Sequence, residues 1–400
     1  MNSGLPKALK IGCTCVGTYL LSYCTRNLLS VSSLGIVQNG VMDKETLGML
    51  SSVYFMIYAF GQLINGIIGD RVRPKFMVLS GLTLSGVAAI AFSSVQTRGA
   101  WLLFYALMGF GMSMLRGPLV RTISENLPKT SARIACVCFS AASFTGPLIV
   151  GICAGFLGWK ELFRSFGIAS IIIGLLSFTI LTLLEKNGNI VIRRQDEKNS
   201  GSKISIFSDP VKIFRLPGFV TYMIVGVIVE ISASSISFWI PTYMSERLLL
   251  SNEASTGVFT LISVVKALCP FLCLALLRIF HDNDILMLRV VFGISAAMYV
   301  LMVFITAPAA NILFFIAALF FNGCGSALLW SVYIPGLSGS GRVSSVNGIL
   351  EFIGYLGAAA ANILFSNIML SIGWSGMTFI WGCVMACGTL AALIPKKKRQ

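Results

Sequence analysis

The sequence contains very little charge for its length. Only 11% of its 400 residues are Asp, Glu, Lys or Arg, and its polar stretches are too short to form a separate water-soluble domain. A single histidine, His281, lies beside Asp282 and Asp284, and the eleven cysteines are scattered among apolar residues. A zinc centre or a Ser-His-Asp triad needs more partners than these. We therefore expect no enzyme activity, no metal site, no cofactor and no disulfide framework.

Long apolar segments occupy most of the chain. Twelve stretches of about twenty residues run from Leu9 to Leu393 with short polar turns between them, and the mean hydropathy is +0.86. A helix needs about 20 residues to cross the hydrocarbon core of a bilayer, where backbone groups find no water. We predict an all-α membrane protein of twelve transmembrane helices. The predicted spans are 9–29, 46–68, 76–93, 101–123, 134–157, 162–184, 219–243, 256–277, 285–305, 312–333, 346–372 and 377–393.

The longest polar stretch divides these spans six and six. We predict an N-terminal bundle over 1–184, a cytoplasmic linker over 185–215, and a C-terminal bundle over 216–400 that ends in a basic tail. A faint repeat supports two halves, because the fifth span ends on GFLGWKELF and the eleventh on LSIGWSGMTF. Two parallel six-helix halves are typical of transporters with a binding site at the membrane midplane.

The net charge of +15 is concentrated on one side of the predicted membrane. With the N-terminus inside, most of the 30 Lys and Arg residues fall in inner loops, as the positive-inside rule requires. This distribution indicates cytoplasmic termini and argues against a nucleic-acid partner. The final PKKKRQ is interpreted as a membrane-surface anchor. The short loops favour a multi-pass protein of a plasma membrane.

Five charged residues fall inside the predicted spans. Inserting a charge into the bilayer costs a few kcal/mol unless the charge is paired or lines a water-filled path. The five residues are Arg26, Arg116, Glu230, Lys266 and Glu351. Three cations against two acids favour an anionic solute, and guanidinium suits bidentate capture of carboxylate or phosphate. The two acids are candidate proton carriers, because a proton and a cation compete for one carboxylate. A structural ion pair is the alternative role for each charge, and Arg26 is the leading candidate for contact with the solute.

Polar and aromatic side chains in the spans extend the predicted binding site. Tyr23, Trp239, Tyr243 and Asn347 are candidates for hydrogen bonding or stacking on a sugar, with membrane packing as the alternative for each.

The turn between the second and third spans reads GIIGDRVRPK, at 66–75. It resembles the G-x-x-x-D-R-x-x-R/K loop of the major facilitator superfamily. In that family the loop latches the two halves in one access state. The resemblance implies a conformational latch made of Gly66, Asp70, Arg71 and Arg73, in which the glycine permits close helix approach.

Four further stretches resemble the organophosphate:phosphate antiporter branch, which contains glycerol-3-phosphate and hexose-phosphate transporters. They are YCTRNLLS at 23–30, RGPLVRT at 116–122, FWIPTY at 238–243 and NGILEFIGYLGAAAA at 347–361. In that branch two arginines grip phosphate; Arg26 matches the first, whereas Ala233 stands at the second. Ser143 and Arg116 replace a histidine and a tryptophan of the branch.

The same first-span stretch is also similar to the anion:cation symporter branch, with Thr25 in place of its acid. That branch moves sugar acids and other carboxylates. The sequence therefore predicts a monomeric secondary transporter of a small organic anion: a sugar phosphate, glycerol phosphate or carboxylate. It would work by alternating access, driven by protons or by exchange for a counter-anion. A transporter-like sensor and an exporter of lipophilic compounds remain as alternatives.

Overall fold

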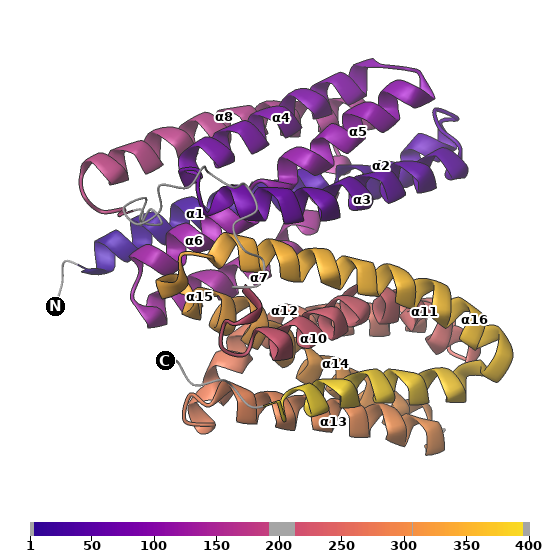
Figure 1. Ribbon diagram of the computed structural model, residues 1–400. Helices are drawn as coiled ribbons and strands as arrows, with labels where there is room; N and C mark the ends of the chain where they lie inside the picture. Colours follow the sequence, from indigo (N-terminus) through magenta and orange to yellow (C-terminus); the bar gives the residue numbers. More distant parts are fainter. Residues whose placement is uncertain (1–3, 192–212, 306, 395–400) are drawn as a thin grey trace. The chain divides into compact units, whose positions relative to one another are not determined.

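A computed structural model describes residues 4–191, 213–305 and 307–394, and within these ranges the chain is helical with no β-strand. Figure 1 shows long helices connected by short turns. The first half of the chain forms α1 (Gly4–Arg26), α2 (Leu28–Gln38), α3 (Lys44–Gly69), α4 (Pro74–Ser94), α5 (Arg98–Ser113), α6 (Arg116–Asn126), α7 (Lys129–Ala154) and α8 (Trp159–Lys186).

The second half adds further helices and two π-helical turns. In chain order these are α10 (Phe219–Glu230), a π-helix (Ile231–Ile236), α11 (Ser237–Glu246), α12 (Asn252–Ile279), α13 (Asp284–Phe304), α14 (Pro308–Ala327), a second π-helix (Leu328–Tyr333), α15 (Ile334–Gly336), a 3₁₀ turn (Ser338–Ser340) and α16 (Val343–Ala391). Gly373 divides α16, because its φ of 64° lies in the left-handed region that favours glycine.

Ten helical segments in the described ranges are long and apolar enough to cross a membrane. The other two predicted spans correspond to interrupted segments: α1 breaks before α2, and α10 passes through a π-helix into α11. Large apolar side chains such as Leu148, Ile152 and Ile172 are more than half exposed, which is the surface that lipid would cover. The all-α, multi-pass prediction is therefore confirmed, although the first helical segment runs beyond the predicted Leu29 to Gln38.

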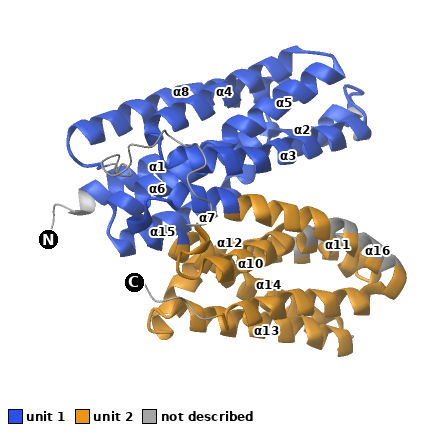
Figure 2. Cartoon of the chain, viewed as in Figure 1, with its two compact units in different colours: residues 1–208, 334–349 blue, residues 209–333, 350–400 orange. Residues whose placement is uncertain are grey.

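The chain forms two compact units, coloured separately in Figure 2. Unit 1 comprises residues 1–208 and 334–349. In it, α4 packs against α8 and α5, and α1 packs against α7 and α8. The close approach of α4 to α8 depends on two facing glycines, because a Cβ on Gly86 would lie 2.5 Å from the carbonyl oxygen of Gly167.

Unit 2 comprises residues 209–333 and 350–400. There α14 packs against α13 and α12, around an aromatic core that includes Trp381, Tyr299 and Phe315. The boundary between the units falls inside α16, between Ile349 and Leu350. The division at 184 and 216 stays a prediction, and both the linker residues 192–212 and the basic tail 395–400 lie outside the described ranges.

Candidate functional site

Three of the five charges predicted inside the membrane lie at irregular turns of their helices. Arg26 is the last residue of α1, and Asn27 leaves the helix before α2 begins. Arg116 is the first residue of α6, after a break at Met114 and Leu115. Glu230 ends α10 at the start of a π-helix. Interrupted helices and π-turns inside membranes are concentrated at ligand sites, where the loosened backbone must meet polar groups.

Aromatic rings surround the guanidinium of Arg26. Its Cζ lies 4.6 Å from the ring centroid of Tyr58, 5.3 Å from that of Phe55 and 5.6 Å from that of Tyr23. Attraction between a cation and the face of an aromatic ring is worth up to about 2 kcal/mol when the pair is desolvated. Arg26 is only partly buried. The rings therefore hold an accessible cation inside the first span, and the structure places the predicted Tyr23 beside it.

The face of α3 that carries Tyr58 continues as a polar stripe. Gln62 Nε2 donates to the Tyr58 hydroxyl at 2.6 Å, and Asn65 Nδ2 donates to Ser113 Oγ at 2.8 Å. Both amides are almost fully buried. The spacing of these residues by three or four positions, which puts them on one face of a helix, is a signal that sequence reasoning missed.

The side-chain amide of Asn347 is buried in unit 1. Its side chain is 1% exposed, and neither its Oδ1 nor its Nδ2 has a hydrogen-bond partner within the described ranges. An unsatisfied buried amide costs about 1–3 kcal/mol and is rare enough to need an explanation. Asn347 belongs to unit 1. Its role in binding stays a prediction.

In unit 2, the candidate Lys266 contacts the interrupted helix. Lys266 Nζ donates to Ser237 Oγ at 2.8 Å, and Ser237 Oγ donates to the carbonyl oxygen of Ser232 at 2.9 Å. Ser232 lies in the π-helix and Ser237 follows it. A cation from α12 is thus brought to the stretch of the seventh span that carries Ala233. Glu230 packs its side-chain stem against Gly354 of α16, and Glu351 is 1% exposed one turn earlier on that helix.

The remaining aromatic candidates lie in a packed cluster in unit 2. Tyr243 is fully buried, and its hydroxyl donates to Asn311 Oδ1 at 2.6 Å. Trp374 packs edge-on against both Tyr243 and Trp239, at 5.2 and 6.1 Å between ring centroids. Trp374 Nε1 donates to Glu246. The described contacts engage Tyr243 in helix packing, whereas Trp239 is only partly buried.

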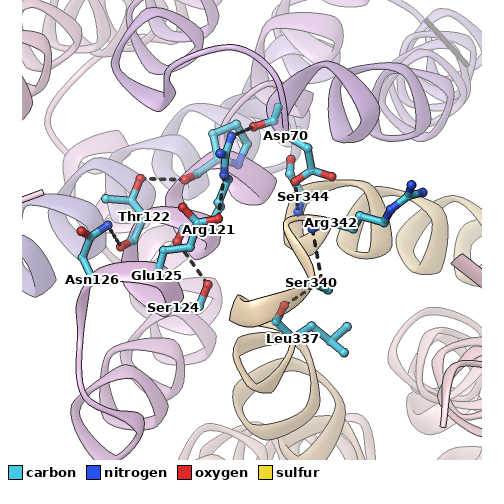
Figure 3. A network of polar contacts seen from close by, with 12 residues as sticks. Asp70, Arg121, Thr122, Ser124, Glu125, Asn126, Leu337, Ser340, Arg342 and Ser344 are labelled. Carbon is cyan, nitrogen blue, oxygen red and sulfur yellow. Dashed lines mark hydrogen bonds and ion pairs between the residues drawn. The ribbon is translucent and has the colours of Figure 1, made fainter. Parts of the chain in front are cut away.

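The carboxylate of Asp70 caps the N-terminus of α16 (Figure 3). Its Oδ1 accepts the backbone N–H of Ser344 and its Oδ2 that of Ser345, both at 2.9 Å. The first helical N–H groups have no partner within the helix, and the helix dipole favours a negative charge there. Residues 70 and 344 both belong to unit 1, and they are 274 positions apart in the sequence.

Burial raises the pKa of the Asp70 carboxyl to about 6. The hydrogen bonds from Ser345 and Ser344, and the charge of Arg121, lower this pKa but do not offset the loss of hydration. The carboxylate is therefore ionised at neutral pH and becomes protonated under mildly acidic conditions.

Small residues and a buried arginine support this cap. A Cβ on Gly66 would lie 2.9 Å from the carbonyl oxygen of Ser344, so only glycine permits this approach of α3 to α16. Arg121 donates to the carbonyl oxygen of Gly69 at 2.9 Å and to Glu125 Oε1 at 3.0 Å. Arg121 and Glu125 are both 2% exposed. A buried ion pair thus fixes the end of α3 that carries Asp70.

The two other residues of the predicted latch belong to a different surface. Arg73 Nη1 lies 3.8 Å from Glu185 Oε2, and Lys75 Nζ lies 2.6 Å from the same oxygen. Arg71 lines a pocket with them.

No cluster of three or more His, Cys, Asp or Glu residues suited to a metal occurs in the part of the chain that the structure describes.

Residues 15–334 of this chain match the family described as Major Facilitator Superfamily. The chain is 23% identical over 160 residues to a "Probable hexose phosphate transport protein" of Chlamydia muridarum, covering 39% of this chain and 35% of the relative. It is 24% identical to the "Glycerol-3-phosphate transporter" of Bacillus subtilis, covering 89% and 85%. It is 21% identical to the "Membrane sensor protein UhpC" of Escherichia coli, covering 62% and 61%. The match thus spans about a third of the hexose phosphate relative.

Solved structures share the architecture at low sequence identity. The outward conformation of the transporter FucP has a TM-score of 0.73 at 12% identity, covering 98% of this chain and 100% of that one. The human organic anion transporter MFSD10 has a TM-score of 0.68 at 13% identity, covering 96% and 99%. These likenesses confirm the predicted twelve-helix fold. The relatives confirm the resemblance to the organophosphate:phosphate antiporter branch.

Proposed function

Because the chain belongs to the Major Facilitator Superfamily, we propose that it is a secondary transporter that moves a small organic anion by alternating access. The observation that carries this proposal is Arg26, a partly buried cation at a break in the first span. Charged residues inside transmembrane segments are costly and rare, and such a residue is by default a candidate for function.

Within unit 2, Lys266 is a second candidate cation for binding the anion. The antiporter branch resembled by the sequence uses an arginine on the seventh span, where this chain has Ala233. The hydrogen bond from Lys266 to Ser237 brings an ammonium group to that part of the span from the neighbouring α12. A point charge on a flexible stem binds anions with less geometric selectivity than a planar guanidinium. The proposed solute is therefore an organic anion related to the branch's phosphate esters, or a carboxylate.

Two acids supply the means of coupling the proposed transport to protons. Glu230 lies on the interrupted seventh span and attracts the positive charge of Lys266. Protonation of Glu230 would release Lys266 to bind the anion, and loss of the proton would restore the pair. Glu351 is the second candidate, on α16. Exchange against a counter-anion is the other source of energy, and it requires neither acid.

The Asp70 cap is the proposed conformational latch. It joins the turn after α3 to the start of α16 by two hydrogen bonds, and α16 continues into unit 2. Opening an access path on this side would break both bonds.

We place the protein in a bacterial inner membrane as a monomer with both termini in the cytoplasm, supported by the distribution of Lys and Arg and by bacterial relatives.

Ligand-dependent thermal stabilisation tests the anion site. Purified protein is heated with phosphorylated sugars, glycerol phosphate, inorganic phosphate, sugar acids and dicarboxylates, alongside Arg26→Ala and Lys266→Ala. Arg98→Ala is the matched control, because Arg98 is 45% exposed and pairs with Glu45. We expect one anion class to stabilise wild type and Arg98→Ala but neither site variant. Equal stabilisation of all four proteins would place the anion elsewhere, and no stabilisation would favour a lipophilic solute.

Similarity to the sensor UhpC supports a second candidate function, a transporter-like receptor for such an anion. Flux in proteoliposomes distinguishes the two. Uptake or exchange that depends on Arg26 supports a transporter. Binding that depends on Arg26 without any flux, under proton and anion gradients of either direction, supports the receptor.

A further inference from the structure

A basic pocket of about 680 Å³ lies in unit 1, at the end of the helices where the Asp70 turn is found. The turn between α3 and α4 contributes Arg71 and Arg73 to its wall, and the start of α4 contributes Lys75. The last turn of α8 contributes Thr182, Glu185 and Lys186. We call these six residues the basic pocket. They lie at one membrane surface, because they follow the span of α3, begin that of α4 and end that of α8.

The charge of the basic pocket is strongly unbalanced. Four cations face one carboxylate, and that carboxylate is already engaged by Lys75 at 2.6 Å. The side chain of Arg73 is 51% exposed and 3.8 Å from the same carboxylate, and Lys186 is also exposed. Such a surface attracts an anion, and arginine in particular forms paired hydrogen bonds with phosphate oxygens.

The wall of the basic pocket also carries an unused hydrogen-bonding group. Thr182 Oγ1 is buried, and it has no hydrogen-bond partner among the residues described. A buried hydroxyl that has lost its water without gaining a partner is destabilising. A phosphate oxygen in the pocket would accept its proton.

Apolar groups next to the charges favour a lipid as the source of that phosphate. Phe76 follows Lys75 on α4 and is 49% exposed, Leu183 follows Thr182 on α8 and is 53% exposed, and Val191 at the pocket edge is 61% exposed. The Lys75 ammonium lies 5.6 Å from the Phe76 ring. The charged side chains match the headgroup of a phospholipid, and the apolar side chains directly beside them match its acyl chains.

We propose that the basic pocket binds the headgroup phosphate of an anionic phospholipid of the leaflet on this side of the membrane. The headgroup would contact Arg71, Arg73 and Lys186 and accept a hydrogen bond from Thr182. Its acyl chains would lie along the exposed apolar faces of α4 and α8. Because Arg71 directly follows Asp70, a bound lipid would stabilise the turn that caps α16.

Lipid titration followed by native mass spectrometry tests this site on the full-length protein. Phosphatidylglycerol is compared with zwitterionic phosphatidylcholine, and water-soluble glycerol phosphate is titrated separately. The pocket variant is Arg73→Gln with Lys186→Gln. The control variant is Lys129→Gln with Arg278→Gln, which removes two exposed cations from the ends of other helices. Each cation near the surface contributes about 1 kcal/mol to the binding of anionic lipid. The pocket variant lacks two of them, so it should bind phosphatidylglycerol about 20- to 30-fold more weakly.

The expected result is tighter binding of phosphatidylglycerol than of phosphatidylcholine, lost in the pocket variant and kept in the control. Thr182→Val removes one hydrogen bond and should weaken binding about 3- to 5-fold. This variant tests the site if the pocket variant does not fold. Equal binding of the two lipids, or equal loss in both double variants, would overturn the proposal. Glycerol phosphate binding that disappears only in the pocket variant, without lipid binding, would identify a soluble ligand instead. Arg26→Ala should leave lipid binding unchanged, so this site and the proposed transport site fail independently.

Discussion

Replacing Gly348 with alanine should detach the start of α16 from α3. A Cβ at this position would overlap the carbonyl oxygen of Gln62 and lie 3.0 Å from the Cα of Gly66. Restoring ordinary contact with the oxygen requires the two backbones to separate by about 1 Å, because both contacts are to backbone rather than to flexible side chains. Overpacking of this kind is destabilising by about 1–3 kcal/mol.

The consequence should reach the Asp70 cap, one turn away. Its two hydrogen bonds are 2.9 Å long, and a separation of about 1 Å would extend them beyond the 3.5 Å at which hydrogen bonding is effectively lost. The assay is hydrogen–deuterium exchange of the amides of Ser344 and Ser345. At 1.4 kcal/mol for each factor of ten, exchange should be about 5- to 150-fold faster in Gly348→Ala.

Gly12→Ala is the matched control for this experiment. A Cβ on Gly12, within α1, would meet no described atom within 4 Å. Alanine there should stabilise the helix by about 0.5–1 kcal/mol and leave exchange at Ser344 and Ser345 unchanged. Unaltered exchange in Gly348→Ala would refute the close packing of α16 on α3, and with it the glycine-dependent latch.

Three further predictions concern named contacts. Since burial raises the pKa of Asp70 to about 6 from the usual 3.8, its contribution to stability is present below pH 4 and is lost as the pH rises through 6. Between pH 4 and pH 7 the free energy of unfolding of wild type should therefore fall by about 2 kcal/mol relative to that of Asp70→Asn in thermal melts, and parallel pH profiles of the two proteins would contradict this. Glu185→Gln should be destabilising by about 2 kcal/mol because it strands Lys75, which is 8% exposed, whereas Glu45→Gln at a surface pair should change stability by less than about 0.5 kcal/mol. Tyr243→Phe should lower stability by about 1 kcal/mol with no change in ligand affinity; a loss of affinity would return Tyr243 to the binding site.

Sequence reasoning identified the features that depend on local composition. Hydropathy alone predicted the helical spans, since a bilayer imposes one length and one polarity on every crossing segment. The GIIGDRVRPK turn was recognisable because its glycines and charges occur at fixed spacing within ten residues. Arg26 stood out as a charge in an apolar segment. Its role in binding stays a prediction.

The partners of these residues could not be read from the sequence. The carboxylate of Asp70 accepts hydrogen bonds from amides 274 and 275 positions away, and an N–H group carries no side-chain signature. Arg71 and Arg73 were grouped with Asp70 by the motif, whereas the structure places them in a separate basic pocket with Glu185. The π-helix at Ile231–Ile236 also lacks a local signal, because ISASSI is compatible with an ordinary helix.

The sequence by itself determined that this chain crosses a membrane many times, which loops carry positive charge, and which few charges lie within the spans. These are consequences of transferring individual segments from water into lipid, and they depend on composition along the chain. Only the tertiary structure decided that Arg26 faces three aromatic rings, that Lys266 reaches the interrupted seventh span, and that Asp70 caps α16. Those contacts arise from close packing between helices, where glycines set the distance and the partners come from remote parts of the chain.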